Sequence, residues 1–310
     1  MIIHAMSHPL NGVTPLGHLG VIAVQGDDAA SFLQGQLTQD FAQLGPAQAR
    51  LAAYCTAKGR MLASFVGFRR ADGEILLVTS RDALAPTHKR LSMFVLRAKA
   101  KLRDASDEFD LYGAAGPAAE SLASSLSEPW SRAEVGSATA VALYPADGQR
   151  RILWMAPARD AVPPGPSLSA ELWSWGDVRS GVATITAPVV EAFVPQMLNY
   201  ESVGGVSFKK GCYPGQEVVA RSQFRGTLKR RAYLAHSQQP LHAGQEVFHE
   251  SDADQPCGTV AQAAPAPGGG WDAIVSMQVA LAQQGALKAG RPEGPALSVE
   301  APPYPLLADV

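Results

Sequence analysis

One cysteine of this chain stands in a setting that could support thiol chemistry. The residues around it are, in order, Lys209, Lys210, Gly211, Cys212, Tyr213, Pro214 and Gly215. Cationic neighbours favour the thiolate, which is the nucleophilic and metal-binding form of cysteine. Glycines on both sides allow backbone shapes closed to other residues, so the loop can expose the sulfur of Cys212 at a tight bend. A surface turn with an incidental cysteine accounts for the same residues equally well.

The basic character of this loop continues along the chain. Residues 209–231 contain seven Lys or Arg residues against one acid, Glu217. The run that begins at Gln216 fits either a helix or a strand, and it carries Arg221 and Arg225. The net charge of the 310 residues is only −2, so no global field attracts nucleic acid. An anionic partner would therefore need this local segment.

Residues 210–217, Lys-Gly-Cys-Tyr-Pro-Gly-Gln-Glu, resemble the signature of the YgfZ family of folate-binding proteins. Further segments that resemble the family, in the expected order, are 32–40, 55–60, 194–200 and 204–208. Members of this family are relatives of the glycine-cleavage T-protein and are similar to mitochondrial iron–sulfur assembly factors of the same superfamily. The resemblance covers most of the chain.

The resemblance implies an α+β fold, in which a T-protein-like ring of α+β folate-binding lobes precedes a C-terminal antiparallel β-barrel. We expect residues 1–110 to form the first lobe, completed by residues 170–228, which return with the signature. Residues 111–169 are expected to form the second α+β lobe. Residues 229–310 are expected to form the barrel.

Local patterns agree with that architecture. Apolar periodicity and turn residues predict strands at 19–24, 50–56, 60–68, 74–79, 139–144 and 151–155. Helices are predicted at 29–37, 80–97, 118–126 and 171–182. After residue 229 the predicted strands are short and separated by Gly/Pro turns, at 231–235, 246–249, 258–261, 271–275 and 296–299. Many short strands of this kind are typical of a small barrel or sandwich.

Trp173 has two interpretations. Core packing is the usual role of a tryptophan on a helix. The resemblance instead implies that Trp173 is a wall of a folate pocket, because the family carries a tryptophan at the matching place. A second family tryptophan would fall near Leu19, where this chain has none. With Leu19 kept as a pocket position, the resemblance also assigns Asn199 and Gln216 to folate binding.

The residues after Trp173 depart from the family pattern. Relatives often have Arg-x-Glu-Ala-Gly where this chain has Asp-Val-Arg-Ser-Gly at 177–181, so the glutamate expected to face the pterin is missing. Asp177 is the one clear acid that remains there. The resemblance further predicts a functional loop around a catalytic Cys212, whose other members are Lys210, Gly211, Tyr213, Gly215, Glu217 and Arg221.

Other motifs argue against several function classes. Gly211 and Cys212 follow Lys210, so the spacing of a phosphate-binding loop is absent. His236, His242, His249 and Cys257 lack the closely spaced pairs of a metal site, and we predict no metal. A stable iron–sulfur cluster takes about four ligands, mostly cysteines, which three dispersed cysteines cannot supply.

Composition bears on where the protein works. Cys55, Cys212 and Cys257 form an odd, sparse set that suits a reducing cytoplasm better than a disulfide framework. The first fifteen residues lack the apolar core of a signal peptide, and no run of about 18 apolar residues exists. We therefore expect a cytoplasmic protein that does not act on membranes.

Three functions compete at this point. The first is a folate-dependent factor that supports iron–sulfur client enzymes, including those that methylthiolate tRNA, with indirect rather than direct tRNA contact. The second is an aminomethyltransferase like the T-protein, which requires a carboxylate as general acid or base. The third is a folate-binding module without chemistry of its own. In the first, tetrahydrofolate or a derivative is the cofactor, and Cys212 could accept a one-carbon unit, ligate iron or form a mixed disulfide.

Overall fold

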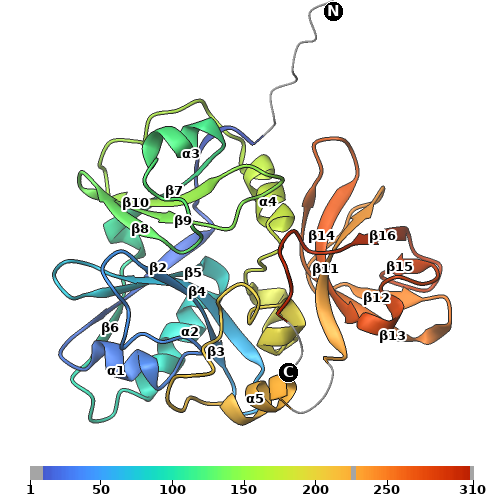
Figure 1. The fold of residues 1–310 in the computed structure, drawn as a ribbon, viewed down its shortest axis with the longest axis horizontal. Coiled ribbons are helices and arrows are strands. Elements are labelled where there is room, and N and C mark those ends of the chain that lie inside the picture. Colours follow the sequence, from blue (N-terminus) through green and yellow to red (C-terminus); the bar gives the residue numbers. More distant parts are fainter. Residues whose placement is uncertain (1–9, 225–227, 308–310) are drawn as a thin grey trace, which may run out of the picture.

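The computed structural model of the chain describes residues 10–224 and 228–307. Two lobes, each built on a five-stranded sheet, stack on one side of the molecule, and a closed β-barrel lies on the other (Figure 1). Helix α4 (Ala170–Arg179) runs between the second lobe and the barrel. The two lobes and the barrel, which come from different parts of the same chain, therefore meet around a common centre.

The first lobe contains an antiparallel sheet in the strand order β3-β4-β5-β2-β6. Its elements are β2 (Leu19–Gln25), α1 (Ala29–Gln34), β3 (Ala49–Cys55), β4 (Met61–Arg69), β5 (Ile75–Ser80), α2 (Arg81–Met93) and β6 (Lys101–Asp104). Side chains alternate across a strand. The paired residues Ile22 and Leu77 accordingly face the core under α1 and α2. Their neighbours Val21 and Val78 face the opposite core, which the lobe shares with the rest of the molecule.

The second lobe contains an antiparallel sheet in the order β1-β7-β10-β9-β8. Its elements are β1 (Gly12–Pro15), η1 (Ser106–Glu108), β7 (Phe109–Ala115), α3 (Pro117–Leu122), β8 (Arg132–Val135), β9 (Ala138–Ala142) and β10 (Arg151–Pro157). Strand β1 comes from the start of the chain, yet it pairs with β7 in this sheet. The expected division of the chain at residues 110, 169 and 228 stays a prediction.

The chain then returns to the first lobe through short elements. These are α4, η2 (Ala187–Val189), η3 (Pro195–Leu198) and α5 (Gln216–Phe224). Ser169 caps α4, because its hydroxyl accepts a hydrogen bond from the backbone N–H of Leu172 at 3.2 Å. Gly181, with φ +69°, lies two residues past the end of the helix in the left-handed region that favours glycine.

The last third of the chain closes into an antiparallel barrel, as predicted from its short strands. The strand order is β11-β14-β13-β12-β15-β16. The elements are β11 (Arg230–Ser237), β12 (Glu246–His249), β13 (Asp252–Pro265), β14 (Trp271–Gln278), η4 (Val279–Leu281), β15 (Leu287–Ala289) and β16 (Ala296–Glu300). Closure leaves no unpaired sheet edge. The predicted α+β fold with a C-terminal antiparallel barrel is confirmed.

Several predicted elements have different bounds in the structure. Helix α2 was expected to run to residue 97 but ends at Met93, and three residues later Leu96 has φ +40°, which a helix cannot accommodate. The strands β1, β6, β7, β8 and β15 were not predicted. Four of these have only three or four residues, so their apolar pattern is too short to detect.

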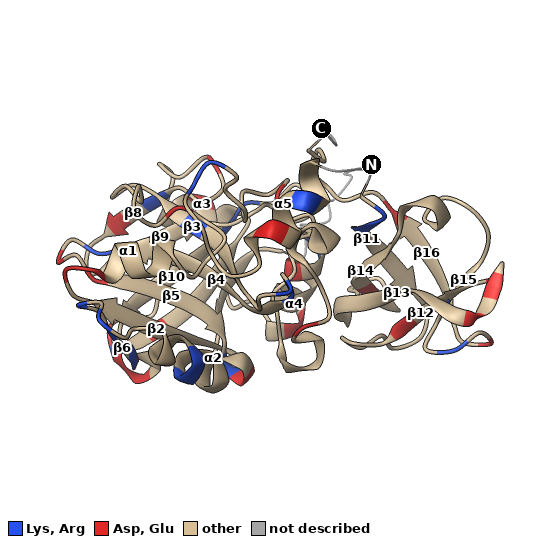
Figure 2. Cartoon of the chain, turned by 90° about the horizontal axis from the view of Figure 1, so that it is seen from below, with Lys and Arg blue, Asp and Glu red and all other residues tan. Residues whose placement is uncertain are grey.

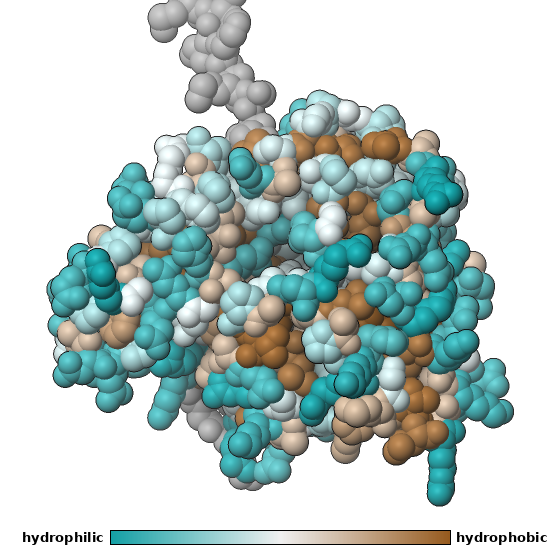
Figure 3. Space-filling view, turned by 180° about the vertical axis from the view of Figure 1, so that it is seen from behind, coloured by the Kyte–Doolittle hydropathy of each residue, from teal (hydrophilic) through white to brown (hydrophobic). Residues whose placement is uncertain are grey.

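Charged residues of both signs are spread over the lobes and the barrel (Figure 2). Brown apolar patches interrupt the surface of the lobes on the face drawn in Figure 3, whereas the barrel on that face is mainly hydrophilic. None of the helices in the described ranges combines the length and the apolar character that crossing a membrane requires. Within those same ranges, His, Cys, Asp and Glu residues do not gather in threes at a place that could hold a metal ion.

Candidate functional site

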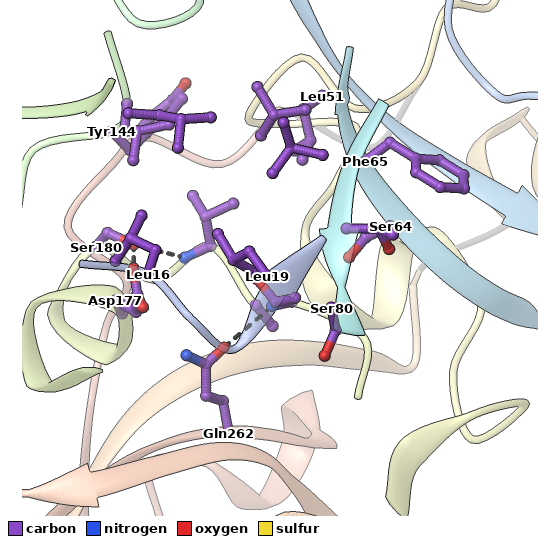
Figure 4. Close-up of a pocket in the computed structure, with 18 of the residues that line it drawn as sticks. Leu16, Leu19, Leu51, Ser64, Phe65, Ser80, Tyr144, Asp177, Ser180 and Gln262 are labelled. Atoms are coloured by element: carbon purple, nitrogen blue, oxygen red, sulfur yellow. Dashed lines mark hydrogen bonds between the residues drawn. The ribbon is translucent and has the colours of Figure 1, made fainter. Parts of the chain in front are cut away.

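A cavity lies where the two lobes, helix α4 and the barrel meet. Its volume is about 200 Å³, and its lining is mostly apolar. The residues labelled in Figure 4 come from β2, β3, β4, β5, α4 and β13 and from the segments between them. An engineered apolar cavity of about 150 Å³ takes up benzene, so this cavity has room for a ring-sized part of a ligand. We call it the interlobe cavity.

Trp173 and Leu19, which the sequence assigned to one pocket, both line the interlobe cavity. Trp173 projects from α4, and only 2% of its surface is exposed. A Cβ added to Gly113 would lie 2.6 Å from three carbons of its six-membered ring, so the indole packs directly on the backbone of β7. The guanidinium carbon of Arg151 lies 4.2 Å from the ring centroid. Trp173 is thus a packed wall of the cavity with little free ring surface.

Arg151 and Asp177 form an ion pair at the edge of the cavity, and both residues belong to its lining. Arg151 comes from β10 and is 3% exposed, while Asp177 comes from α4. A buried guanidinium without a partner would be costly, so Asp177 stabilises Arg151 over the tryptophan ring. The carboxylate that the sequence marked as the one clear acid is therefore already engaged.

The barrel also contributes to the cavity. Gln262 of β13 lies in the lining, and its side-chain oxygen accepts a hydrogen bond from the backbone N–H of Thr184 at 3.0 Å (Figure 4). Ser180 hydroxyl donates to the carbonyl oxygen of Asp177 at 2.7 Å and accepts from Val182 N–H at 3.3 Å. These bonds fix the segment that follows α4, so the polar atoms around the cavity are held in place.

The loop of residues 210–217 lies at a different place, against α1 and the turn after β3. Lys210 is 7% exposed, and its ammonium donates hydrogen bonds to the carbonyl oxygens of Gln34 at 2.6 Å and Leu37 at 2.9 Å. Gln34 is the last residue of α1, where a cation is favourable, and Leu37 lies three residues beyond it. Burial lowers the pKa of Lys210 to about 8, against the opposing effects of Asp40 and Cys212.

Two glycines allow this loop to approach the first lobe closely. A Cβ at Gly215, which has φ +83°, would lie 2.4 Å from the carbonyl oxygen of Thr56 and 2.7 Å from the Cα of Gly59. Tyr213 is buried beside them, its ring 4.4 Å from the Lys210 ammonium, and burial raises the pKa of its hydroxyl. Alanine at position 215 would collide with backbone atoms that cannot move away.

The segment 204–208 joins the same assembly. The hydroxyl of Thr38 donates to the carbonyl oxygen of Gly205 at 2.6 Å, and the N–H of Ser207 donates to the carbonyl oxygen of Thr38 at 2.9 Å. The sequence segments 32–40, 55–60, 204–208 and 210–217 therefore meet at one end of the first sheet. We call this assembly the signature cluster; among the described residues, none of 208–217 lines the interlobe cavity.

Cys212 is exposed, whereas Cys55 and Cys257 are buried. Burial raises the pKa of the Cys55 thiol to about 12, and it also raises the pKa of Cys257. Both buried thiols are thus held in the inert protonated form. The structure places the one exposed thiol where the sequence predicted a reachable sulfur.

Three cations of the predicted basic patch are engaged within the protein, whereas Lys209 and Lys229 are exposed. Lys210 points inward, and Arg221 pairs with Glu217 at 2.5 Å on the surface of α5. Arg231 pairs with the buried Glu201 at 2.7 Å. Arg225 lies outside the described residues.

Two of the predicted folate contacts lie away from the cavity. Asn199 is fully buried, and its amide exchanges two hydrogen bonds with the backbone of Ala232, which join the return segment to β11. Gln216 begins α5 in the signature cluster, and its N–H donates to the carbonyl oxygen of Tyr213 at 3.1 Å. Their assignment to folate binding stays a prediction, which their position does not support.

Relatives of known identity match the chain along most of its length. It is 35% identical to the "tRNA-modifying protein YgfZ" of Vibrio vulnificus (strain CMCP6) over 232 residues, which cover 73% of this chain and 70% of that protein. The protein of the same name from Shigella sonnei (strain Ss046) is 34% identical over 236 residues, covering 73% and 72%. The chain belongs to the YgfZ family.

The remaining comparisons concern the YgfZ fold. Residues 6–147 match the GCVT N-terminal domain. The crystal structure of the glycine cleavage system aminomethyltransferase T from Bartonella henselae superposes with a TM-score of 0.68, at 17% identity, over 96% of this chain and 88% of that one. That likeness confirms the predicted T-protein-like fold. At this level of identity it carries no information on activity.

Proposed function

We propose that this chain binds a reduced folate, tetrahydrofolate or a derivative, in the interlobe cavity. The observation that carries the proposal is an apolar cavity at the junction of both lobes and the barrel, walled by Trp173 and Leu19. Ligand sites are typically apolar clefts with a few fixed polar groups. Here the Arg151–Asp177 pair and Gln262 are those groups, so the residues present fit a flat ring system that carries polar edges.

We further propose that the bound folate serves an accessory factor of iron–sulfur enzymes, including enzymes that methylthiolate tRNA. The name of the relatives, "tRNA-modifying protein", supports a link to tRNA modification. The contact with tRNA would be indirect, through the client enzymes. We place this work in the cytoplasm, since thiols such as Cys212 stay reduced there.

Cys212 is the residue that we propose links the two parts of this function. It is the exposed thiol of a loop whose other members are anchored by Lys210 and Gly215. That anchoring presents the sulfur at a fixed place on the surface. The chemical step at the sulfur stays open among one-carbon acceptance, iron ligation and mixed-disulfide formation.

An aminomethyltransferase activity fits the geometry less well. Such an enzyme needs a carboxylate that can exchange a proton at the folate amine. Asp177 is paired with Arg151, so its carboxylate is already engaged by a guanidinium and does not face the cavity as a free acid. We therefore expect no replacement of the T-protein when the purified chain is mixed with the other glycine-cleavage components.

The folate proposal is tested by titrating tetrahydrofolate, under reducing and anaerobic conditions, into the purified protein in a calorimeter. We expect saturable binding of one ligand per chain below millimolar concentration. Heat that stays at the level of dilution up to millimolar ligand contradicts the proposal.

The accessory role is tested by complementation in cells that lack the native gene. Cys212→Ser should lose support of the iron–sulfur client enzymes while it keeps the melting temperature of the wild type. Cys257→Ala, in the barrel core, serves as a control for loss of a cysteine as such. Full rescue by Cys212→Ser would leave a folate-binding module without thiol chemistry.

A further inference from the structure

Strand β13 of the barrel contains an irregularity next to the interlobe cavity. Val260 pairs with Val275 of β14, and Gln262 pairs with the adjacent residue, Ile274. Ala261 is thus an extra residue on one strand, which is a β-bulge. Bulges re-aim side chains, and they are frequent beside functional sites.

The bulge decides on which side of the barrel wall Gln262 lies. Val260 belongs to the barrel core, and side chains two residues apart in an unbroken strand point the same way. If residues 260–262 alternated regularly, with no bulge, Gln262 would face that apolar core. Instead Ala261 and Ala264 pack in the core between barrel and lobes, and Gln262 lines the cavity (Figure 4).

One end of the Gln262 amide is already committed. Its Oε1 accepts the hydrogen bond from Thr184 N–H, so the amide cannot flip without leaving that donor unpaired. The other end is therefore the NH₂ group. In the described parts of the chain no acceptor takes a hydrogen bond from this Nε2, and the group is left as a fixed donor at the cavity.

We infer that Gln262 Nε2 donates a hydrogen bond to a carbonyl oxygen of the bound ligand, which makes the barrel part of the binding site. The inference rests on the proposed folate function. A neutral donor suits an uncharged acceptor, and Arg151 and Asp177 of the cavity lining are already paired with each other. Gln262 is thus a specificity-determining residue, selecting ligands that present a carbonyl oxygen over analogues that present an amino group there.

Two substitutions separate this role from a purely structural one. Gln262→Glu keeps an oxygen for Thr184 N–H but replaces the donor by a carboxylate oxygen. Gln262→Leu removes both the acceptor oxygen and the donor NH₂ group. Gln255→Glu is the matched control, because Gln255 is an exposed residue of the same strand. Each protein is titrated with tetrahydrofolate in the calorimeter, and its melting temperature is measured.

We expect Gln262→Leu to weaken tetrahydrofolate binding about fivefold to tenfold, the equivalent of one hydrogen bond. Gln262→Glu should weaken it more than tenfold, because two oxygens would face each other, while Gln255→Glu binds as the wild type. Wild-type affinity, or tighter binding, in Gln262→Glu overturns the inference. Should Gln262→Glu fail to fold, wild-type affinity in Gln262→Leu overturns it.

The same titrations distinguish failure of the proposed folate function from failure of the inference about Gln262. If the wild type binds no tetrahydrofolate, the proposed function falls and this inference falls with it. If the wild type binds and the Gln262 variants bind equally well, only the inference is wrong.

Discussion

The interlobe cavity and the signature cluster are built in opposite ways. The cavity collects residues that are far apart in the sequence, from Leu16 to Ala263, and no short motif contains them. The signature cluster is formed by contiguous motifs, and the loop of residues 210–217 is anchored to the first lobe at a few positions. Lys210 binds carbonyls at the end of α1, and Gly215 fits against Thr56.

This difference shows that residues which are easy to recognise as a sequence motif can serve mainly to hold a loop in place. Of the residues from Lys210 to Glu217, several hold the loop in place, and Cys212 is the member whose reactive atom is reachable. The cavity, by contrast, has no sequence signature of its own, and its ligand contacts depend on the packing of three units. The following predictions probe that contrast, from the largest expected effect to the smallest.

Trp173→Ala should cause the largest loss of stability. The indole is almost fully buried on Gly113 and under Arg151, and truncation of such a ring costs about 3–5 kcal/mol. Denaturant unfolding of the variant measures the loss. The comparison variant is Trp271→Ala, which truncates a half-buried ring on the barrel and should cost less. A loss below about 1 kcal/mol for Trp173→Ala would mean that the ring is a free stacking platform instead.

Lys210→Met should destabilise the signature cluster by about 1–3 kcal/mol at pH 7, because it removes the donor to the carbonyl oxygens of Gln34 and Leu37. The cost should grow as the pH rises from about 8 toward 10.5. In that window native Lys210 has lost its proton while the unfolded chain retains it, so the wild type gains stability with pH.

Urea unfolding of wild type and variant at several pH values measures this trend. Lys209→Met, at an exposed neighbour, is the matched control and should show no such dependence. A cost of Lys210→Met that stays constant between pH 7 and 10 would contradict the buried position of the ammonium.

Cys212 should be the one thiol per native chain that reacts rapidly with a disulfide reagent. Cys55 and Cys257 are buried with raised pKa values, so they should react only after denaturation. Cys212→Ser should abolish the rapid phase and change the free energy of unfolding by less than about 0.5 kcal/mol. Two or more rapidly reacting thiols in the native protein would show that the buried cysteines are accessible.

The sequence predicted the elements whose patterns are local. Strands such as β4 and β5 and five of the six barrel strands were visible because their apolar residues alternate between turn residues. Strand β7 was missed, although it is an interior strand of its sheet, paired on both sides. Its Gly113 weakens the strand pattern, and the structure shows the reason: the ring of Trp173 occupies the space where a side chain would be.

The candidate site was predictable only in part, because some of its contacts depend on packing between segments that are far apart in the sequence. Leu19 and Trp173 were assigned to one pocket through the family resemblance, and the structure brings them to the same cavity. Gln262 was missed because its orientation depends on one extra residue in β13, and the sequence does not reveal a bulge. The Lys210 side chain points inward because a carbonyl oxygen at the end of α1 accepts its hydrogen bond. The sequence around Lys210 shows only a run of basic residues and does not reveal this contact.

The most direct test of the central claim is the affinity for tetrahydrofolate of two variants, one in each region. Leu19→Asp places a carboxylate in the apolar wall of the interlobe cavity, and Cys212→Ser alters the signature cluster. Leu96→Asp, at a leucine that is 87% exposed, is the control for the same substitution elsewhere. We predict binding at least about tenfold weaker for Leu19→Asp, since a desolvated charge is costly, and wild-type binding for the other two. Loss of binding in Cys212→Ser with full binding in Leu19→Asp would place the folate at the signature cluster and contradict the account.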